Sequence, residues 1–245
     1  MTRIRLDHAL VQRGLCASRS RAADAIRRGT VHVDGRPATK PGQSISDAER
    51  IEMDDPASGY VSRAALKLVA ALDAFGYNPA GKICLDIGAS TGGFSQVLLQ
   101  RGAARVYAVD VGHGQLVSEL AEDHRIVNLE KTNARDLSLD LIPDPPQAVT
   151  CDASFIGLRQ VARQGLHLAA SGAFCVLLVK PQFELSPAEL GKGGIVKSAS
   201  LAKATAERAA TWLAEDMGWE DTQLAQSPVL GQHGNREFLL GGVKP

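Results

Sequence analysis

The order of apolar and polar residues along the chain predicts a layered α/β domain from about residue 63 onward. Short, continuous apolar runs alternate there with longer amphipathic segments. Continuous runs of strand length are typical of strands buried on both faces, and amphipathic segments are typical of helices that cover a parallel sheet. We therefore expect a doubly wound sheet that is mostly parallel, with the last strand inserted antiparallel after a short excursion. The expected strands are 83–87, 105–110, 125–129, 148–152, 173–179, 221–226 and 236–241, and the expected helices are 62–76, 93–101, 115–121, 157–168 and 199–217.

The first 55 residues have a different pattern. Residues 5–14 and 18–29 are short amphipathic segments that each end in a glycine, which predicts two helices with glycine C-caps. Residues 30–39 alternate around an Asp-Gly pair, which is typical of a β-hairpin. The sequence thus predicts a small separate α+β domain.

The boundary between these two regions is marked by an acidic stretch followed by Pro56, Ser58 and Gly59. Proline, serine and glycine in close succession are typical of a linker. We expect the first domain to cover 1–55, the linker 56–62 and the second domain 63–245.

Charge is distributed unevenly over the 245 residues, although the formal net charge is zero. Residues 1–45 contain nine Lys/Arg and three Asp/Glu, so 9 − 3 = +6, and the remainder carries −6. This asymmetry favours a polyanionic partner for the first domain, with a solvated charged face as the alternative. The four cysteines are scattered without a CxxC pair, and no leader or long apolar segment is present. We expect buried free thiols and a soluble, cytoplasmic protein without membrane contact.

A glycine-rich loop follows the first strand of the second domain. The apolar run from Ile83 passes Asp86 and enters Gly-Ala-Ser-Thr-Gly-Gly, and the next strand ends in Asp110. An acid at that second position is the usual acceptor for a ribose hydroxyl. Asp86 would repel a pyrophosphate but suits the ammonium of S-adenosylmethionine, so the loop favours this methyl donor over a dinucleotide. An ordinary tight turn is the third alternative.

Polar residues after the third strand extend this expectation. Asn133 or Asp136 could bind the adenine amino edge, or the segment could be a turn with an Asx cap. The expected cofactor-binding residues are Asp86, Gly88, Ser90, Thr91, Gly92, Gly93, Phe94, Asp110, Val111, Asn133 and Asp136.

Four ionisable residues occupy the ends of separate elements. Lys180 closes a buried apolar run directly before a proline, and Asp152 ends the preceding strand. Glu237 stands near the start of the last strand, and Lys67 lies on the first helix of the domain, off its apolar face, where taken alone a lysine is most often a surface residue. A lysine in a crevice can have its pKa lowered by burial and by a neighbouring cation, which allows it to act as a general base. A single lysine of this kind is equally often structural, but convergence of four such groups favours a site.

Two resemblances connect these patterns to known families. The pattern RLDxxLVxRGLxxSRxxAxxxIRxGxVxVDGxxxxKP over about residues 3–55 resembles an S4 RNA-binding domain. Lys67 in SRAALKL, Asp152 in CDASFI, Lys180 in LVKPQFE and Glu237 in GNREF resemble the Lys-Asp-Lys-Glu tetrad of FtsJ/RrmJ-like ribose 2′-O-methyltransferases. Together the motifs resemble the TlyA family, often labelled hemolysin-like, nearly from end to end. The RNA contacts that the S4 resemblance implies are Arg3, Arg5, Arg19, Arg21, Arg27, Arg28 and Lys40.

The resemblance implies a Rossmann-like class I methyltransferase that methylates a cytidine ribose of ribosomal RNA with S-adenosylmethionine, on free RNA or on a ribosomal subunit. Lys180 is then the expected base, Lys67 beside it favours its neutral form, and the two carboxylates orient the lysines. No metal is expected, since no cluster of His and Cys ligands is visible. The chain ends at Pro245 without the C-terminal helical extension of longer family members. The resemblance implies that its substrate range is restricted to RNA of the large ribosomal subunit. The alternatives are a hemolysin-like membrane-active protein and a non-catalytic RNA-binding protein.

Overall fold

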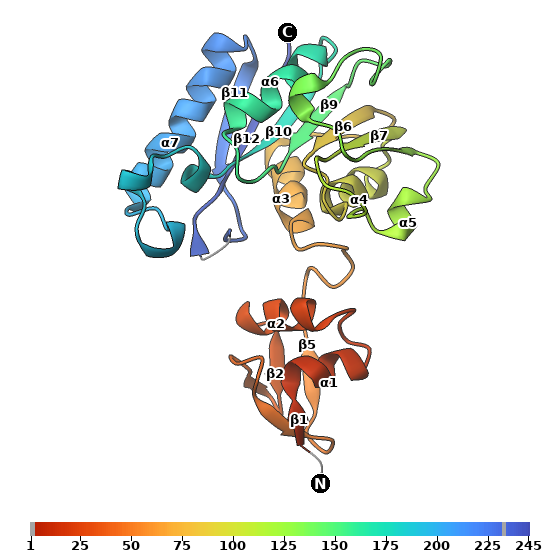
Figure 1. Ribbon diagram of the computed structural model, residues 1–245, viewed down its shortest axis with the longest axis vertical. Helices are drawn as coiled ribbons and strands as arrows, with labels where there is room; N and C mark the ends of the chain where they lie inside the picture. Colours follow the sequence, from red (N-terminus) through yellow and green to blue (C-terminus); the bar gives the residue numbers. More distant parts are fainter. Residues whose placement is uncertain (1–2, 232–233) are drawn as a thin grey trace. The chain divides into compact units, whose positions relative to one another are not determined.

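The computed structural model describes residues 3–231 and 234–245. The chain divides into two compact units, Met1–Gly59 and Tyr60–Pro245, which are treated separately below (Figure 1). None of the helices in the described ranges combines the length and the apolar character that crossing a bilayer requires.

The N-terminal unit packs two helices against two small antiparallel sheets. The buried side chains of Leu6, Leu10, Ile26 and Ile45 form its core. Helix α2 begins where the hydroxyl of Ser18 accepts a hydrogen bond from the backbone N–H of Arg21 at 3.3 Å, as a serine N-cap does. One sheet pairs β1 with β4, and the other has the order β3-β2-β5. The elements are β1 Arg3–Arg5, α1 Leu6–Gln12, α2 Arg19–Arg27, β2 Val31–Val33, β3 Arg36–Pro37, β4 Ser44–Ser46 and β5 Ile51–Met53.

The C-terminal unit is built on a seven-stranded sheet of order β11-β12-β10-β9-β6-β7-β8. Strand β12 is antiparallel to both of its neighbours, and the pairs among β10, β9, β6, β7 and β8 are parallel. The predicted mostly parallel sheet with an antiparallel last strand is therefore confirmed (Figure 1). The strands are β6 Ile83–Ile87, β7 Arg105–Val109, β8 Ile126–Leu129, β9 Ala148–Cys151, β10 Phe174–Val179, β11 Glu220–Gln226 and β12 Phe238–Val243.

Helices cover both faces of this sheet. On one face, α3, α4 and α5 contribute to a core that includes Leu68, Leu98 and Leu120. On the other face, α6 and α7 contribute to a core that includes Leu166 and the fully buried Trp212. The two-sided cover explains why every residue of β10 is buried and why its sequence is a continuous apolar run. The helices are α3 Ala65–Phe75, α4 Gly93–Gln100, α5 Ser118–Ala121, α6 Leu158–Leu168 and α7 Ala199–Thr211, which continues into a π-helical turn at Trp212–Asp216.

Two element boundaries differ from the prediction in ways that affect the site. Helix α5 begins at Ser118 instead of residue 115, because the carboxylate of Glu130 accepts the backbone N–H groups of Gly114, Gln115 and Leu116. These three bonds hold the chain in a loop and, led by the one from Leu116, lower the pKa of Glu130 to about 2. Strand β12 begins at residue 238, so Glu237 lies in the approach to the strand.

Candidate active site

The glycine loop lies at the carboxyl end of β6. Gly88 has φ +80°, and a Cβ there would come within 2.9 Å of the backbone of Ala153, so only glycine fits this close approach. Asp86 lies beneath the loop and is fully enclosed. Its carboxylate accepts hydrogen bonds from Ser95 Oγ at 2.7 Å and Thr150 Oγ1 at 3.0 Å. Burial raises the pKa of Asp86 to about 6 in spite of these two bonds.

A cavity of about 560 Å³ opens beside the ends of β6 and β7. Asp110 is held in its wall by its own loop, since its carboxylate accepts Ser90 N at 2.8 Å and Gly112 N at 2.7 Å. Carboxylate oxygens have further lone pairs, so both can still bind hydroxyl groups. Val111 is 72% exposed and gives the cavity an apolar edge. Of the expected cofactor-binding residues, this lining contains Gly88, Ser90, Asp110, Val111 and Asn133.

Some expected cofactor-binding residues have a second role or lie outside this lining. Asn133 caps a 3-10 turn, accepting the N–H of Arg135 at 3.1 Å, so the turn with an Asx cap is present, and Asn133 also lines the cavity. Asp136 is exposed, and neither it nor Asp86 nor Gly92 belongs to the lining of this cavity or of its neighbour. Gly88, Ser90, Thr91, Gly93 and Phe94 line the neighbouring cavity.

This second cavity, of about 210 Å³, brings the four predicted ionisable residues together. Lys67 Nζ donates to Glu237 Oε2 at 2.6 Å and lies 3.9 Å from Asp152 Oδ1. Lys180 Nζ is 2.7 Å from the same Oδ1. Asp152 therefore stands between the two lysines, and each lysine has a carboxylate partner. The two cavities adjoin, since both linings include Gly88, Ser90, Asp152 and Ser154.

The sheet topology explains how these residues converge. Asp152 and Lys180 directly follow the neighbouring parallel strands β9 and β10, so both reach the same edge of the sheet. Lys67 comes from α3, and Glu237 comes from the approach to β12. A Cβ at Gly231 would collide with the carboxylate of Glu237, so the lack of a side chain there makes room for the acid.

Several cavity residues were not predicted from the sequence. Ser154 Oγ accepts a hydrogen bond from Lys180 at 2.8 Å, and Lys180 also donates to the backbone oxygen of Asp152 at 3.0 Å. The motifs around Asp152 and Lys180 could have predicted these residues, because side chains that directly follow Asp152 and Lys180 also line the cavity. The unpredicted residues of the two linings include Ser62, Arg63, Gln115, Thr132, Ser154, Phe155, Gln182, Phe183 and Gly231.

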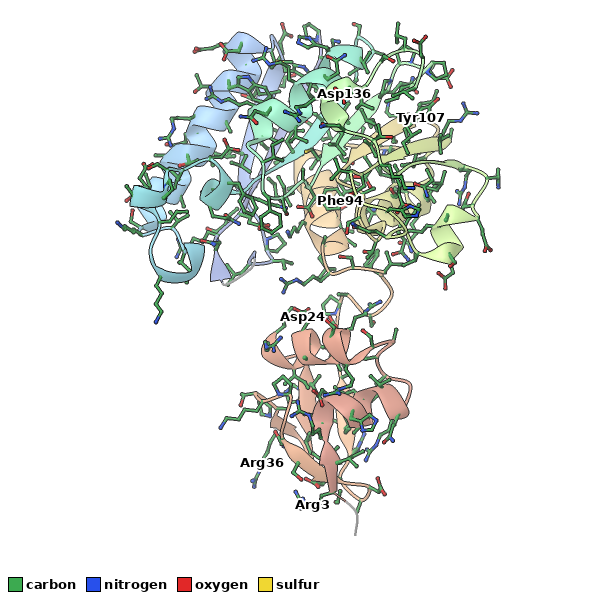
Figure 2. The ribbon with its side chains drawn as sticks, in the orientation of Figure 1. Arg3, Asp24, Arg36, Phe94, Tyr107 and Asp136 are labelled. Carbon is green, nitrogen blue, oxygen red and sulfur yellow. The ribbon has the colours of Figure 1, made fainter. Side chains whose placement is uncertain are left out.

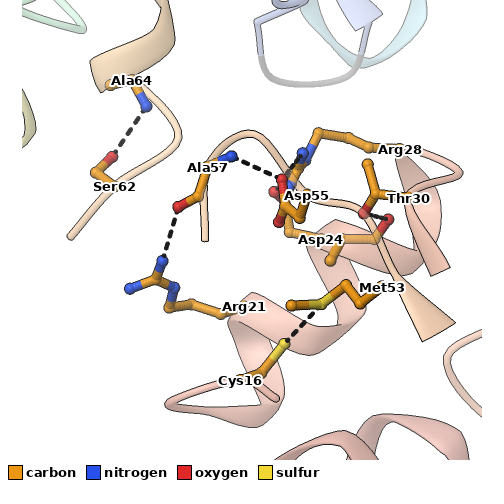
Figure 3. A network of polar contacts seen from close by, with 11 residues as sticks. Cys16, Arg21, Asp24, Arg28, Thr30, Met53, Asp55, Ala57, Ser62 and Ala64 are labelled. Carbon is orange, nitrogen blue, oxygen red and sulfur yellow. Dashed lines mark hydrogen bonds and ion pairs between the residues drawn. The ribbon is translucent and has the colours of Figure 1, made fainter. Parts of the chain in front are cut away.

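In the N-terminal unit, most of the basic residues expected to contact RNA have partners within the unit. Arg28 forms a bidentate pair with Asp55 at 2.7 Å and also binds Asp24, and Arg21 donates to the backbone oxygen of Ala57 (Figure 3). Burial raises the pKa of Asp55, but the hydrogen bonds from Arg28 and Ala57 outweigh this effect, and the pKa is lower than usual.

The remaining basic residues of this unit are more exposed. Arg5 and Arg19 share the buried carboxylate of Asp7, yet their side chains remain more than half exposed. Arg3 bonds to Ser44 and lies, with Arg36, at the opposite end of the unit from Asp24 (Figure 2). Arg27 and Lys40 are exposed. The unit therefore presents a cationic surface made of paired arginines and of exposed basic side chains.

Comparison with known proteins identifies both units. The profile of the FtsJ-like methyltransferases matches residues 60–244, which is most of the chain, and that of the S4 domain matches residues 4–51. The chain belongs to the FtsJ-like methyltransferase family. This membership confirms the predicted resemblance, the Rossmann-like fold and the expectation of an S-adenosylmethionine-dependent methyltransferase.

Known proteins match this FtsJ-like chain over nearly its whole length. A 16S/23S rRNA (cytidine-2′-O)-methyltransferase TlyA from Mycobacterium tuberculosis is 45% identical, with 97% of this chain and 89% of the relative covered. A protein named Hemolysin A from Brachyspira hyodysenteriae is 40% identical over 96% of this chain and 98% of its own length. The solved structure of a candidate hemolysin from Streptococcus thermophilus matches with a TM-score of 0.77 and 38% identity, covering 100% of this chain and 89% of that one.

Proposed function

We propose that this FtsJ-like protein methylates the ribose 2′-OH of a cytidine in ribosomal RNA, with S-adenosylmethionine as the methyl donor. The observation that carries the proposal is the position of Lys67, Asp152, Lys180 and Glu237 in one cavity that adjoins a nucleoside-sized cavity at the glycine loop. The name of the mycobacterial relative supports the choice of cytidine and ribosomal RNA.

The larger cavity fits the donor. Asp110 offers carboxylate oxygens to ribose hydroxyls, and Val111 offers an apolar edge to a purine ring. The close approach of Gly88 to Ala153 leaves no room for a side chain, so the loop forms a backbone cradle at the junction of the two cavities. S-adenosylmethionine supplies a methyl group on a cationic sulfur when it is bound. Asp86 is enclosed and accepts hydrogen bonds from Ser95 in α4 and Thr150 in β9, so it ties β6 to the helix and the strand beside it.

The smaller cavity suits deprotonation of a hydroxyl. The 2′-OH is a poor nucleophile near neutral pH and needs a base in line with the acceptor position. We assign this role to Lys180, whose side chain is nearly buried and held by Asp152 and Ser154. Because the Lys180 ammonium already donates to two oxygens and pairs with a carboxylate, it must release a proton before it can accept one. Asp152 Oδ1, at 2.7 Å, is the nearest acceptor for the proton that Lys180 releases.

The N-terminal unit is proposed to bind the RNA. Its S4 fold and its excess of cationic side chains suit contacts with phosphates, which position a protein on folded RNA. In this proposal residues 1–55 form the RNA-binding domain, residues 56–62 form the linker, and residues 63–245 form the domain that catalyses methyl transfer. Arg27 and Lys40, which are exposed, are better suited to phosphate contacts than Arg28, which is held by two carboxylates.

The test is single-turnover methyl transfer to purified ribosomal subunits by Lys180→Ala and Lys180→Arg, with product mapping at the ribose. Both variants are expected to lose roughly a hundredfold or more in rate, the usual scale for a positioned base. Arginine keeps the positive charge, but its guanidinium stays protonated near neutral pH and cannot accept a proton. Lys203→Ala, which removes an exposed lysine paired with Glu207 on α7, is the matched control.

The outcomes separate the alternatives. Wild-type rates in Lys180→Arg would exclude proton abstraction by this residue. Binding of S-adenosylmethionine and RNA without any transfer by the wild-type protein would favour the non-catalytic RNA-binding alternative. Release of haemoglobin from erythrocytes by the same preparation would favour the membrane-active alternative that the name of the Brachyspira relative suggests.

A further inference from the structure

A third cavity, of about 240 Å³, adjoins the two already described. It shares Gln182 and Phe183 with the tetrad cavity and Phe155 with the nucleoside-sized cavity. The remaining walls are Leu190, the peptide groups around Gly193 and Gly194, and Asn235. The side chain of Asn235 holds this wall in place, since it donates to Gly194 O at 3.0 Å and accepts from Val196 N at 3.0 Å.

Gln182 is the unusual polar group of this region. Its side-chain oxygen is enclosed, and within the described ranges 3–231 and 234–245 it has no hydrogen-bond partner. An enclosed acceptor without a partner costs stability, and native structures usually avoid it unless the group serves a ligand. The side chain of Gln182 lines both the tetrad cavity and the third cavity, so it stands where a ligand that occupies both would meet it.

Two aromatic rings form an apolar wall beside this amide. The rings of Phe155 and Phe183 have centroids 5.1 Å apart and are tilted by 48°. Phe155 is 79% exposed, and its backbone has φ +64°, a conformation that a phenylalanine rarely adopts. Together they can bind a nucleobase, because the exposed ring of Phe155 offers a flat surface on which a base can stack, and the amide of Gln182 offers hydrogen bonds to the edge of the base.

We infer that Gln182 determines base specificity by binding the Watson–Crick edge of the target cytosine, an inference that rests on the proposed function. The base is attached to C1′ of the ribose, directly beside the carbon that carries the 2′-OH. A base site must therefore adjoin the tetrad cavity, and the third cavity does so at Gln182. Cytosine offers the acceptor N3 beside its amino donor, which complements the donor and acceptor of one amide. Uracil offers the reverse order, so the amide must turn over to bind it.

The experiment compares ribosomal subunits that have either cytidine or uridine at the position that the wild-type protein modifies. Single-turnover rates are measured for the wild type and for Gln182→Met, which keeps the length and apolar volume of the side chain but removes the amide. We expect the variant to lose about tenfold in rate on cytidine and to bring the cytidine-to-uridine ratio close to one, with unchanged affinity for S-adenosylmethionine. An unchanged ratio overturns the inference.

Gln164→Met is the matched control. The amide of Gln164 is also half-buried, but it donates to the backbone oxygen of Leu137 at 2.7 Å and so has a structural role. This variant should lower the midpoint of thermal unfolding and leave the cytidine-to-uridine ratio as in the wild type. A change of ratio in the control equal to that in Gln182→Met would overturn the inference, because a general loss of packing would then explain both.

Binding of cytidine 5′-monophosphate and uridine 5′-monophosphate, followed by NMR in the presence of S-adenosylmethionine, gives a measure that does not depend on catalysis. The wild type should bind the cytidine nucleotide more tightly, and Gln182→Met should bind both equally. Absence of methyl transfer by the wild type would refute the proposed function, while these two affinities would still decide the role of Gln182. Equal binding of the two nucleotides by the wild type would refute that role.

Discussion

The buried carboxylate of Asp86 should make the stability of the C-terminal unit depend on pH, and Asp86→Asn should remove this dependence. Burial raises the pKa of Asp86 to about 6, from 3.8 for the free group. Because the pKa in the folded state is the higher one, the stabilising contribution is complete below pH 3.8 and is lost as the pH rises through 6. A difference of about two units corresponds to about 3 kcal/mol of unfolding free energy.

The assay is urea unfolding of the full chain between pH 4 and pH 8, followed by tryptophan fluorescence. Both tryptophans, Trp212 and Trp219, are almost completely buried in the C-terminal unit, so the signal reports on the unit that contains Asp86. From pH 4 to pH 8, the unfolding free energy of Asp86→Asn should rise relative to that of the wild type by about 2–3 kcal/mol. Asp73→Asn, at an exposed carboxylate paired with Arg101, is the control. Parallel pH profiles for wild type and Asp86→Asn would refute the reasoning.

Three further predictions follow from the sites. Asp110→Ala should weaken S-adenosylmethionine binding by about 1.5–3 kcal/mol in calorimetry, the scale of a charge-assisted hydrogen bond, and unchanged affinity would contradict its assignment. Arg28→Ala should accelerate hydrogen exchange in α2 by at least tenfold, because the buried carboxylate of Asp55 loses its partner. Arg27→Ala should leave exchange in α2 unchanged and weaken RNA binding. The reverse result would show that Arg28 binds RNA. Gly231→Ala should slow single-turnover transfer at least tenfold by displacing Glu237, with S-adenosylmethionine affinity unchanged, and wild-type transfer would exclude this packing role.

The architecture of the C-terminal unit was predictable because its buried strands are short, mainly apolar runs, of which β10 is the clearest. The run from Phe174 to Val179 is buried on both faces and stops at Lys180, and that transition marks both the strand and the crevice. The pairing of Lys67 with Glu237 was not predictable from the pattern, since 170 residues separate them and only the folded sheet brings them together.

Charge count alone was a weaker guide in the N-terminal unit. The excess of arginines predicted a cationic surface, but Arg28 is bound by Asp24 and by Asp55, 27 residues away. An ion pair between distant residues leaves no local signature in the sequence. The loop geometry at Asp110 escaped prediction for a related reason, since it depends on backbone N–H groups of Ser90 and Gly112, which every residue except proline has.

Ionic strength should act very differently on RNA capture and on the chemical step. Lys67 and Lys180, the two lysines of the proposed active site, are nearly buried and each is paired with a carboxylate, so mobile ions have little access to their charges. The arginines Arg5 and Arg19 are more than half exposed, and contacts between such groups and phosphates are made by releasing condensed counterions. Added salt should therefore raise the concentration of RNA needed for half-maximal rate and leave the rate at saturating RNA nearly constant. Inhibition by salt would then be relieved by adding more RNA.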